Sequence, residues 1–332
     1  MRNVLHLHKG QKKGRNKVRY IHDMKEGDRL GGVYLCKQKS SAVTKNGKHY
    51  ENVTLQDRTG QLDCKIWEPN SEGIAEFDAL DYVYVVGSVS AFNGALQASL
   101  RQVRRADESE YVPADYVPIT DKNRKAMYME LMAIRDTVKN EYLRALLDAF
   151  FGDKAFAKSF YEHSAAKSIH HSFVGGLLEH TLAVTKLCVY LAKNYPALRY
   201  DLLITSAILH DAGKVKELSE FPTNEYTDEG QLLGHIMIGA EMIHDKAAEI
   251  EGFPELLERE LKHCILSHHG QFEFGSPKKP AIIEAMALSM ADNMDAKLET
   301  WTEVLSQNGD PEEWLGFNKV LDTNLRRTLS VT

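Results

Sequence analysis

Histidine and aspartate residues recur in the second half of the chain at the ends of apolar segments. The segment AILHDAGKV places His210 beside Asp211 at the end of a predicted buried helix, with Lys214 three residues later. Imidazole nitrogens and carboxylate oxygens bind divalent cations, and sites without a thiolate suit manganese, iron, cobalt or zinc. We therefore interpret this dipeptide as part of a metal site whose other ligands lie elsewhere in the chain.

Further apolar segments carry side chains of the same kinds. They are GGLLEHTLAV with His180, LLGHIMIGAEM with His235, ILSHHGQFEFG with His268 and His269, and LSMADNMDAKL with Asp292. His268 follows Cys264 by four residues and Asp292 follows Leu288 by four, so a helical period turns both side chains toward the core. Because an unpaired buried polar group costs on the order of a few kcal/mol, we expect bound cations to collect them.

These ligands exceed the needs of one ion, so two ions are expected. The first is assigned His180, His210, Asp211 and Asp292, and the second Asp211, His235, His268 and His269, with the Asp211 carboxylate shared. Two ions about 3.5–4 Å apart can bind a phosphate and generate the attacking hydroxide, so Asp211 is also a predicted catalytic residue. Lys214 is predicted to neutralise a phosphate oxygen; alternatively it caps its helix end.

Residues beside these ligands are candidates for substrate contacts. His170 and His171 precede the His180 helix and would contact a phosphate or the leaving group, or else only begin that helix. In the loop GQFEFGSPKKP, aromatic rings can stack on a terminal base and lysines can hold phosphates. The residues concerned are Phe272, Phe274, Lys278 and Lys279.

The first third of the chain has the pattern of short strands. In HYENVTLQD the side chains of Val53 and Leu55 alternate with polar ones, and QLDCKIW follows after the turn DRTG. With GDRLGGVYLCKQK, DYVYVVGSVS and GALQASLRQV, the last two joined by a turn at Phe92-Asn93-Gly94, five strands are predicted, which suits a small barrel.

Three outward side chains of this region suit a single-stranded nucleic acid. They are Tyr50, Lys65 and Trp67. Base stacking contributes about 1–3 kcal/mol per base, and a cation adds attraction to the phosphates. The alternative is structural, with Trp67 closing the end of the barrel and Tyr50 packing on a neighbouring domain.

The predicted fold class is α+β multidomain, a five-stranded barrel followed by an all-α domain. The predicted segments are a basic tail (1–19), the barrel (20–105), a linker (106–120), the all-α domain (121–318) and a C-terminal tail (319–332). Residues 1–19 contain seven Lys and Arg without an acidic residue, which fits either a solvated tail or a nucleic-acid-binding arm.

The composition of the chain argues against a protein that coats nucleic acid, a membrane or secreted protein, and a disulfide-rich protein. The formal net charge of −6 argues against coating nucleic acid wholesale, although local basic patches can still bind it. No apolar run approaches the roughly 20 residues of a membrane span and no signal peptide is evident, so a cytoplasmic location is expected. The four scattered cysteines are predicted to be reduced core residues rather than disulfides or zinc ligands.

The ordered set His, His-Asp, His, His-His, Asp resembles the HD-domain superfamily of metal-dependent phosphohydrolases. The barrel resembles the OB-fold, and both together, with HHSFVGGLLEHTLAV and SHHGQFEFGSP, resemble the YhaM family of bacterial 3′-to-5′ exoribonucleases. The resemblance implies the ligand set above, two divalent ions, and exonuclease action on single-stranded RNA, with single-stranded DNA as a further substrate. Manganese is the expected metal, with cobalt, iron(II) or zinc as alternatives. Self-association is left open.

Two other functions fit parts of this pattern. One is hydrolysis of nucleotides or cyclic dinucleotides by the same kind of site, although HHGQFEFGSPKKP lacks the GYP motif of the cyclic-dinucleotide branch. The other is a non-catalytic single-strand DNA-binding or replication-associated protein with structural metals. Metal-dependent oxygenase chemistry also occurs on such helices, but nothing in the barrel favours it.

Overall fold

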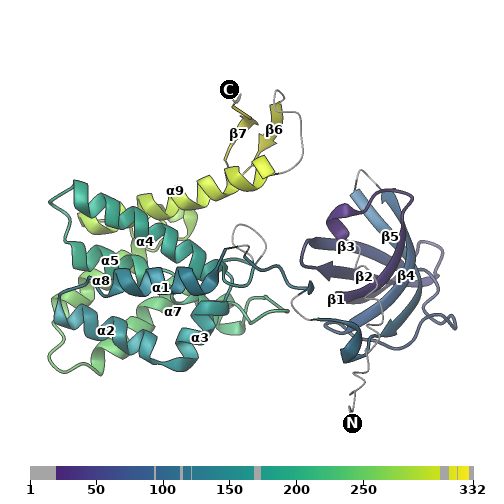
Figure 1. Ribbon diagram of the computed structural model, residues 1–332, viewed down its shortest axis with the longest axis horizontal. Helices are drawn as coiled ribbons and strands as arrows, with labels where there is room; N and C mark the ends of the chain where they lie inside the picture. The colour runs from purple at the N-terminus through teal and green to yellow at the C-terminus, as the bar shows by residue number, and fades with distance from the viewer. Residues whose placement is uncertain are drawn as a thin grey trace, which may run out of the picture. The chain divides into compact units, whose positions relative to one another are not determined.

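A computed structural model describes residues 20–92, 95–112, 115–120, 122–167, 173–306, 314–319 and 321–328 of the chain (Figure 1). The chain divides into two compact units, Met1–Val117 and Pro118–Thr332. We call them the barrel unit and the helical unit, and each is described by itself.

Five strands close the barrel unit. They are β1 (Arg29–Val43), β2 (His49–Asp57), β3 (Gly60–Ile66), β4 (Tyr82–Phe92) and β5 (Ala95–Arg105), after a short 3-10 helix, η1 (Ile21–Asp23). The strand order is β1-β2-β3-β5-β4, with β3 and β5 parallel and the other pairs antiparallel. The five-stranded barrel predicted from the sequence is confirmed. Asn93 and Gly94 of the predicted turn lie outside the described residues.

The alternation of side chains in β2 and β3 turns one face of each strand into the barrel core, as predicted for Val53 and Leu55. Val53, Leu55, Leu62, Cys64 and Ile66 are all buried there. The DRTG turn is fixed by one buried carboxylate, because Asp57 accepts hydrogen bonds from the Thr59 backbone at 2.7 Å and from the Ile21 backbone at 2.6 Å. All four cysteines of the chain are buried and free, as expected.

The predicted linker is divided between the two units. Tyr111, after the 3-10 helix η2 (Glu108–Glu110), stacks on Tyr82 with ring centroids 3.9 Å apart, within the barrel unit. Ile119 forms a bridge to Val174 and belongs to the helical unit.

Nine helices build the helical unit within its described residues. They are α1 (Arg124–Arg135), α2 (Glu141–Gly152), α3 (Lys154–Glu162), α4 (Gly176–Asn194), α5 (Tyr200–Leu209), α6 (Lys214–Glu217), α7 (Asp228–Ala248), α8 (Glu255–Ser267) and α9 (Ile283–Ser306). Side chains of Asn123, Asn140, Asp153 and Thr227 accept the free N–H groups at the starts of α1, α2, α3 and α7. The all-α domain predicted after the barrel is therefore confirmed.

The core of the helical unit forms around α5. Every residue from Leu202 to Leu209 is buried, and α4, α8 and α9 pack around this helix. Its C-cap, His210, thus enters the middle of the unit. Among the described residues no helix combines the length and apolar composition that a bilayer crossing requires.

The C-terminal segment differs from the prediction. Residues 314–318 were expected in the all-α domain and 319–332 in a tail, whereas β6 (Trp314–Asn318) and β7 (Thr323–Arg326) pair as an antiparallel hairpin. Gly316 adopts φ 89° at a register shift of this hairpin, and Asp322 adopts φ 49° before β7. Such positive φ values interrupt a helix and favour a tight turn.

Candidate metal centre

The histidines predicted as metal ligands converge inside the helical unit with one ring nitrogen each already engaged. The Nδ1 atoms of His180 and His235 lie 2.7 Å from Asp295 Oδ2 and 2.9 Å from Glu217 Oε1. Those of His210, His268 and His269 donate to the backbone carbonyls of Ala207, Ile265 and Phe274 at 2.7–2.8 Å. Because Nδ1 carries the proton in each ring, Nε2 keeps a lone pair that can bind a metal.

His180, His210 and Asp292 form one cluster of possible ligand atoms, all within 4.8 Å of one another. The residues come from α4, the end of α5 and α9. His180 Nε2 lies 3.1 Å from Asp292 Oδ1 and 3.2 Å from His210 Nε2. A positive charge shared by the two nitrogens, either a metal cation or a proton on His180 Nε2, stabilises their approach at this distance.

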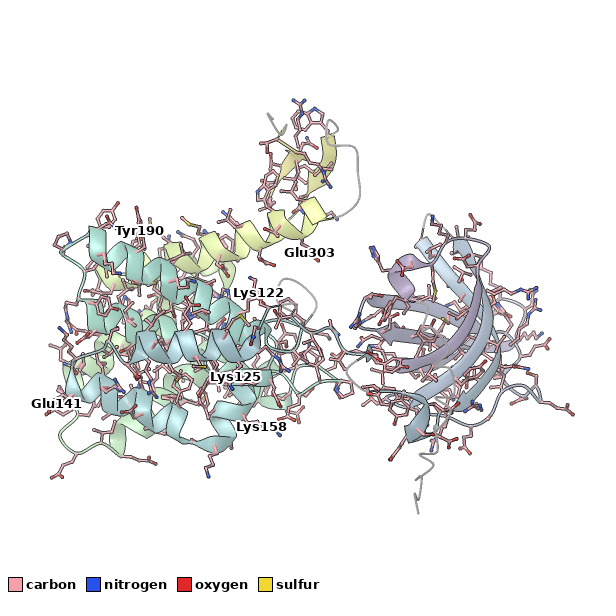
Figure 2. All side chains as sticks on the ribbon, viewed as in Figure 1. Lys122, Lys125, Glu141, Lys158, Tyr190 and Glu303 are labelled. Atoms are coloured by element: carbon pink, nitrogen blue, oxygen red, sulfur yellow. The ribbon has the colours of Figure 1, made fainter. Side chains whose placement is uncertain are left out.

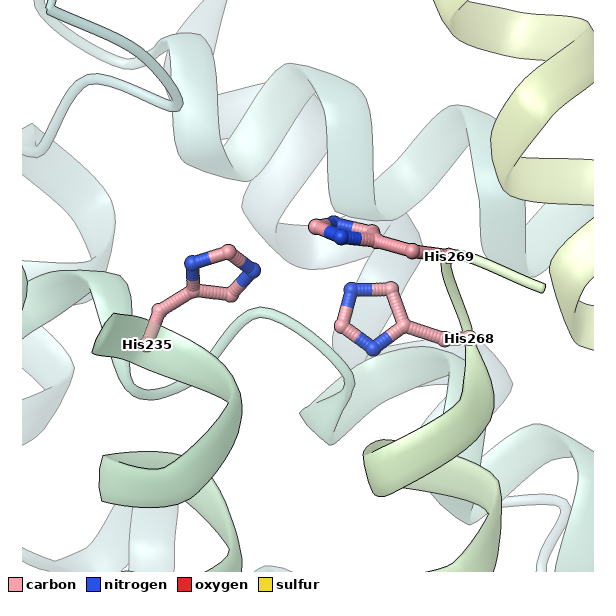
Figure 3. Close-up of side chains that lie close together, drawn as sticks. All are labelled: His235, His268 and His269. Atoms are coloured by element: carbon pink, nitrogen blue, oxygen red, sulfur yellow. The ribbon is translucent and has the colours of Figure 1, made fainter. Parts of the chain in front are cut away.

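His235, His268 and His269 form a second cluster by the same criterion. Figure 3 shows the three rings turned toward one another, His235 from α7 and the other two from the end of α8. Ring centroids of His235 lie 5.6 Å from His268 and 5.2 Å from His269. The two clusters therefore divide the histidines as the sequence predicted.

Asp211 lies between the two clusters and presents one oxygen to each. Its Oδ2 lies 3.4 Å from His210 Nε2 and 3.5 Å from His180 Nε2. Its Oδ1 lies 3.5 Å from His235 Nε2 and 3.7 Å from His268 Nε2. A carboxylate in this position can bridge two cations.

Three buried atoms on the second side of Asp211 have no hydrogen-bond partner among the described residues. They are Asp211 Oδ1, His235 Nε2 and His268 Nε2. Each unpaired buried polar atom costs about 1–3 kcal/mol. All three are acceptors, so a cation satisfies them together, and the nitrogen and oxygen donors suit a first-row divalent metal.

The charges of the centre match this chemistry. Burial raises the pKa of Asp211, but Lys214, His210 and His235 together outweigh burial and hold this pKa well below its usual range. Burial also lowers the pKa of His180, yet Asp292 and Asp295 overcome it and raise the pKa to about 10. At His268 burial and the neighbouring His269 hold the pKa well below the usual range. Metal ligands must be deprotonated, so a cation competes with a proton at His180 and not at His268.

Lys214 contacts the shared carboxylate directly. Its Nζ lies 2.7 Å from Asp211 Oδ2, and its side chain is largely buried. Burial lowers the pKa of Lys214, but Asp211 outweighs burial and raises it, so the ammonium stays charged. The lysine therefore lies beside the ligands rather than in solvent at the helix end.

Glycines allow the segments around Asp211 to approach closely. A Cβ on Gly213 would lie 2.1 Å from the His235 carbonyl oxygen, so only glycine fits between α6 and α7. Gly234 adopts φ 72° and kinks α7 directly before His235. The kink turns the His235 backbone N–H toward Glu217 Oε1, 2.9 Å away.

Comparisons with known proteins cover the part of the chain that contains this centre. A family model described as the HD domain matches residues 177–297, a range that includes every proposed ligand. The 3'-5' exoribonuclease YhaM of Listeria monocytogenes is 35% identical over 286 residues, covering 85% of this chain and 90% of that protein. The YhaM of Bacillus velezensis is 37% identical over 280 residues, covering 84% and 87%, and that of Bacillus licheniformis is 35% identical over 289, covering 86% and 90%. The chain belongs to the YhaM family.

Two residues that position ligands in this YhaM-family member were not predicted from the sequence. Asp295 holds the His180 ring and Glu217 holds both the ring and the backbone of His235. Asp295 follows Asp292 by three residues and Glu217 follows Lys214 by three. That helical spacing, which keeps side chains on one face, was the available signal.

The structure describes some, but not all, of the residues that were predicted to contact substrate in the helical unit. His170 and His171 lie outside the described residues. Phe272 and Phe274 form the exposed 3-10 helix η4, and the Phe274 carbonyl accepts the His269 N–H, which fixes this loop to the second cluster. Lys279 Nζ lies 5.3 Å from the centre of the Phe272 ring.

The three residues predicted on the barrel surface lie together. The Tyr50 and Trp67 ring centroids are 5.1 Å apart, and Lys65 Nζ lies 5.5 Å from the centre of the Tyr50 ring. The Trp67 indole N–H donates to Ser99 Oγ at 3.2 Å, while its side chain remains 44% exposed. The barrel thus presents an aromatic and basic surface of the kind that stacks bases.

Proposed function

We propose that this chain is a divalent-metal-dependent 3′-to-5′ exoribonuclease that hydrolyses phosphodiester bonds of single-stranded RNA. The observation that carries the proposal is the Asp211 carboxylate, whose two oxygens face two separate histidine clusters. Relatives at 35–37% identity over about 85% of the chain bear the name of this activity. It is also part of this proposal that seven residues bind two ions, with manganese preferred over cobalt, iron(II) or zinc. The seven residues are His180, His210, Asp211, His235, His268, His269 and Asp292.

The residues of the centre have separate roles in this reaction. His180, His210 and Asp292 would hold one ion and His235, His268 and His269 the other, with Asp211 on both. Bound divalent ions supply Lewis acidity, which neutralises the scissile phosphate and lowers the pKa of an attacking water. Lys214 keeps the Asp211 carboxylate in place and brings a positive charge close to the phosphate. Asp295 and Glu217 fix the ring orientations of His180 and His235.

Aromatic side chains in both units would hold the strand. In the helical unit Phe272 and Phe274 are exposed beside His269, where a terminal base could stack. In the barrel unit Tyr50, Lys65 and Trp67 would bind bases and backbone farther along the strand. Because phosphate attraction contributes, affinity should fall with salt, and because every base can stack, little sequence preference is expected.

The aromatic surface of the barrel favours a polymeric substrate over a mononucleotide. A hydrolase of nucleotides or cyclic dinucleotides needs no second unit in which half-buried Tyr50 and Lys65 lie beside exposed Trp67. Single-stranded DNA as a further substrate and a cytoplasmic location belong to the same proposal. His170 and His171 remain proposed contacts for the phosphate or leaving group.

A direct test follows a 5′-labelled single-stranded RNA with the metal-free protein and with added manganese. The expected result is a ladder of products shortened from the 3′ end, formed only with the metal. Asp211→Asn should remove this activity, whereas Asp245→Asn, an exposed aspartate on α7, serves as the matched control. Hydrolysis of deoxynucleoside triphosphates or cyclic dinucleotides, with the RNA left intact, would overturn the proposal.

A further inference from the structure

The hairpin of β6 and β7 presents two large aromatic side chains to solvent. Trp314 is 65% exposed and Phe317 is 59% exposed. In Figure 2 the hairpin follows the end of α9, where Glu303 is labelled. A folded domain normally buries rings of this size, because each covers about 150–250 Å² of surface. Two such rings exposed on one short hairpin therefore indicate a binding surface.

A β-bulge brings both rings to the same face of the hairpin. Trp314 and Phe317 are three residues apart, so in a regular strand their side chains would point to opposite faces. The register shifts between Trp314, which pairs with Arg326, and Phe317, which pairs with Asn324. Arg326 and Asn324 are two residues apart and share a face, so the two rings share that face with them. Gly316 provides the positive φ, 89°, inside this bulge.

The opposite face of the hairpin holds its buried apolar side chains. Leu325 lies between Asn324 and Arg326 in β7, so it points away from the rings, and it is 1% exposed. Leu315 of β6 is half-buried. The hairpin therefore covers its own apolar face without using the two aromatic side chains.

Cations accompany the rings. The guanidinium carbon of Arg326 lies 5.8 Å from the centre of the Trp314 ring. Lys319, directly after β6, is exposed. Residues 314–328 contain three Lys and Arg and one acid, Asp322, although the whole chain has a formal net charge of −6. The hairpin is thus a basic segment of an acidic protein, and its charge complements that of phosphates.

We propose that the hairpin of β6 and β7 is a second binding surface for single-stranded RNA, with Trp314 and Phe317 stacked on neighbouring bases and Arg326 beside the phosphates. The inference rests on the proposed function, because it takes the strand degraded at the metal centre as the ligand. Rings stack on bases, and a guanidinium attracts phosphates. The barrel surface combines the same parts, since two aromatic rings lie beside one cation there as well.

The spacing of the two rings favours a single strand over a duplex. Asn324 and Arg326 lie about 7 Å apart along β7, and the residues opposite them in β6 are spaced similarly. Bases of one strand in a duplex are stacked about 3.4 Å apart, whereas bases of a single strand can be separated to meet two rings. An RNA duplex should therefore compete poorly for the hairpin.

Anisotropy of a labelled single-stranded oligoadenylate tests the stacking. The intact protein is used with a chelator, so that the RNA stays whole. Trp314→Ala/Phe317→Ala should weaken binding roughly 25-fold, about fivefold per ring, with an unchanged circular dichroism spectrum. Tyr190→Ala should leave the affinity unchanged, because this ring, labelled in Figure 2, is 64% exposed on α4, outside the hairpin.

The variant Trp314→Tyr/Phe317→Tyr keeps two rings and should retain most of the affinity. Wild-type affinity in the double alanine variant would overturn the proposal. That result would leave the proposed function intact, since metal-dependent shortening of RNA is measured separately.

Two variants of Arg326 test the role of its charge. Each phosphate contact to a single strand contributes about 0.7 to the slope of log affinity against log salt. Arg326→Gln should lower this slope by about 0.7, whereas Arg326→Lys keeps the charge and should preserve the slope. Equal slopes for the glutamine variant and the wild type would remove the phosphate contact from the proposal.

A covalent label distinguishes RNA from a protein partner on this surface. Single-stranded RNA containing 4-thiouridine, irradiated with the intact protein, should cross-link to Trp314 or Phe317. Cross-links confined to the barrel would contradict the proposal. Light scattering on Trp314→Ala/Phe317→Ala covers the other class of partner. A fall in mass with unchanged RNA affinity would assign the hairpin to a contact between copies of the chain, and would overturn the proposal.

Discussion

The two units differ in whether the polar atoms of their candidate binding sites already have hydrogen-bond partners in the protein. In the helical unit, buried acceptor atoms of Asp211, His235 and His268 lack hydrogen-bond partners among the described residues. In the barrel unit, Trp67 donates to Ser99 and its ring lies against Tyr50. The helical centre is therefore costly without a cation, whereas the barrel surface is stable without a ligand. This difference predicts that chemistry and metal dependence reside in the helical unit, whereas the barrel contributes strand affinity alone.

The largest expected effect comes from the carboxylate between the two clusters. In Asp211→Asn one oxygen becomes an amide nitrogen, which cannot bind a cation, so one cluster loses its shared ligand. Transition-state stabilisation worth several kcal/mol should disappear, lowering kcat on the order of 10³-fold. Single-turnover kinetics on labelled RNA measures this, with Asp245→Asn as the control. Retention of kcat within about tenfold would place the chemistry elsewhere.

Metal removal should affect one unit and not the other. A chelator is expected to abolish RNA degradation and to increase hydrogen exchange in α4, α7 and α9, which carry His180, His235 and Asp292. Ion at about 100 times its dissociation constant stabilises a folded site by about 2.7 kcal/mol, so re-addition of manganese should restore protection. Peptides from β1 to β5 are the internal control and should exchange equally in both states. Equal changes in both units would remove the distinction.

An intermediate effect is expected from the residue that holds one ligand in place. Glu217 accepts hydrogen bonds from both Nδ1 and the backbone N–H of His235, each at 2.9 Å. Glu217→Gln weakens this hold on the ring, and loss of such a partner typically costs 10–100-fold in metal affinity. Titration calorimetry with manganese should show one weakened site and one unchanged site, because Glu217 has no contact with the His180 cluster in the described hydrogen bonds. Two equally weakened sites would contradict separate clusters.

The smallest effect is expected in the barrel. Trp67→Ala removes one exposed stacking surface, which should weaken binding of single-stranded RNA by about 1 kcal/mol, or roughly fivefold. Because Trp67 lies in the barrel unit, kcat at saturating RNA should not change. Fluorescence anisotropy and steady-state kinetics measure the two quantities, with Phe92→Ala, another exposed aromatic of the barrel, as the control. A fall in kcat with unchanged affinity would reverse the assigned roles.

Local patterns made some parts of the fold and the site predictable. Val53 and Leu55 alternate with polar residues, so the strand and its buried face follow from the sequence alone. His210 and Asp211 could be predicted as ligands because a polar pair that ends a fully apolar helix is carried into the core, where it needs a partner.

Other features depend on contacts between residues far apart in the chain. His180 and its partner Asp295 are separated by 115 residues, and no local pattern shows that the ring nitrogen and carboxylate meet. The orientation of Asp211, with one oxygen toward each cluster, is set by Lys214 and the packing of α5. The hairpin of β6 and β7, with positive φ values at Gly316 and Asp322, crosses the predicted boundary at residue 318 between the all-α domain and the C-terminal tail.

Anomalous diffraction from crystals grown with manganese tests the central claim most directly. The expected result is two peaks about 3.5–4 Å apart, one bound by Asp211 Oδ2 with His180 and His210, the other by Asp211 Oδ1 with His235 and His268. One peak alone, or two peaks that share no Asp211 contact, would contradict the bridging role of this carboxylate.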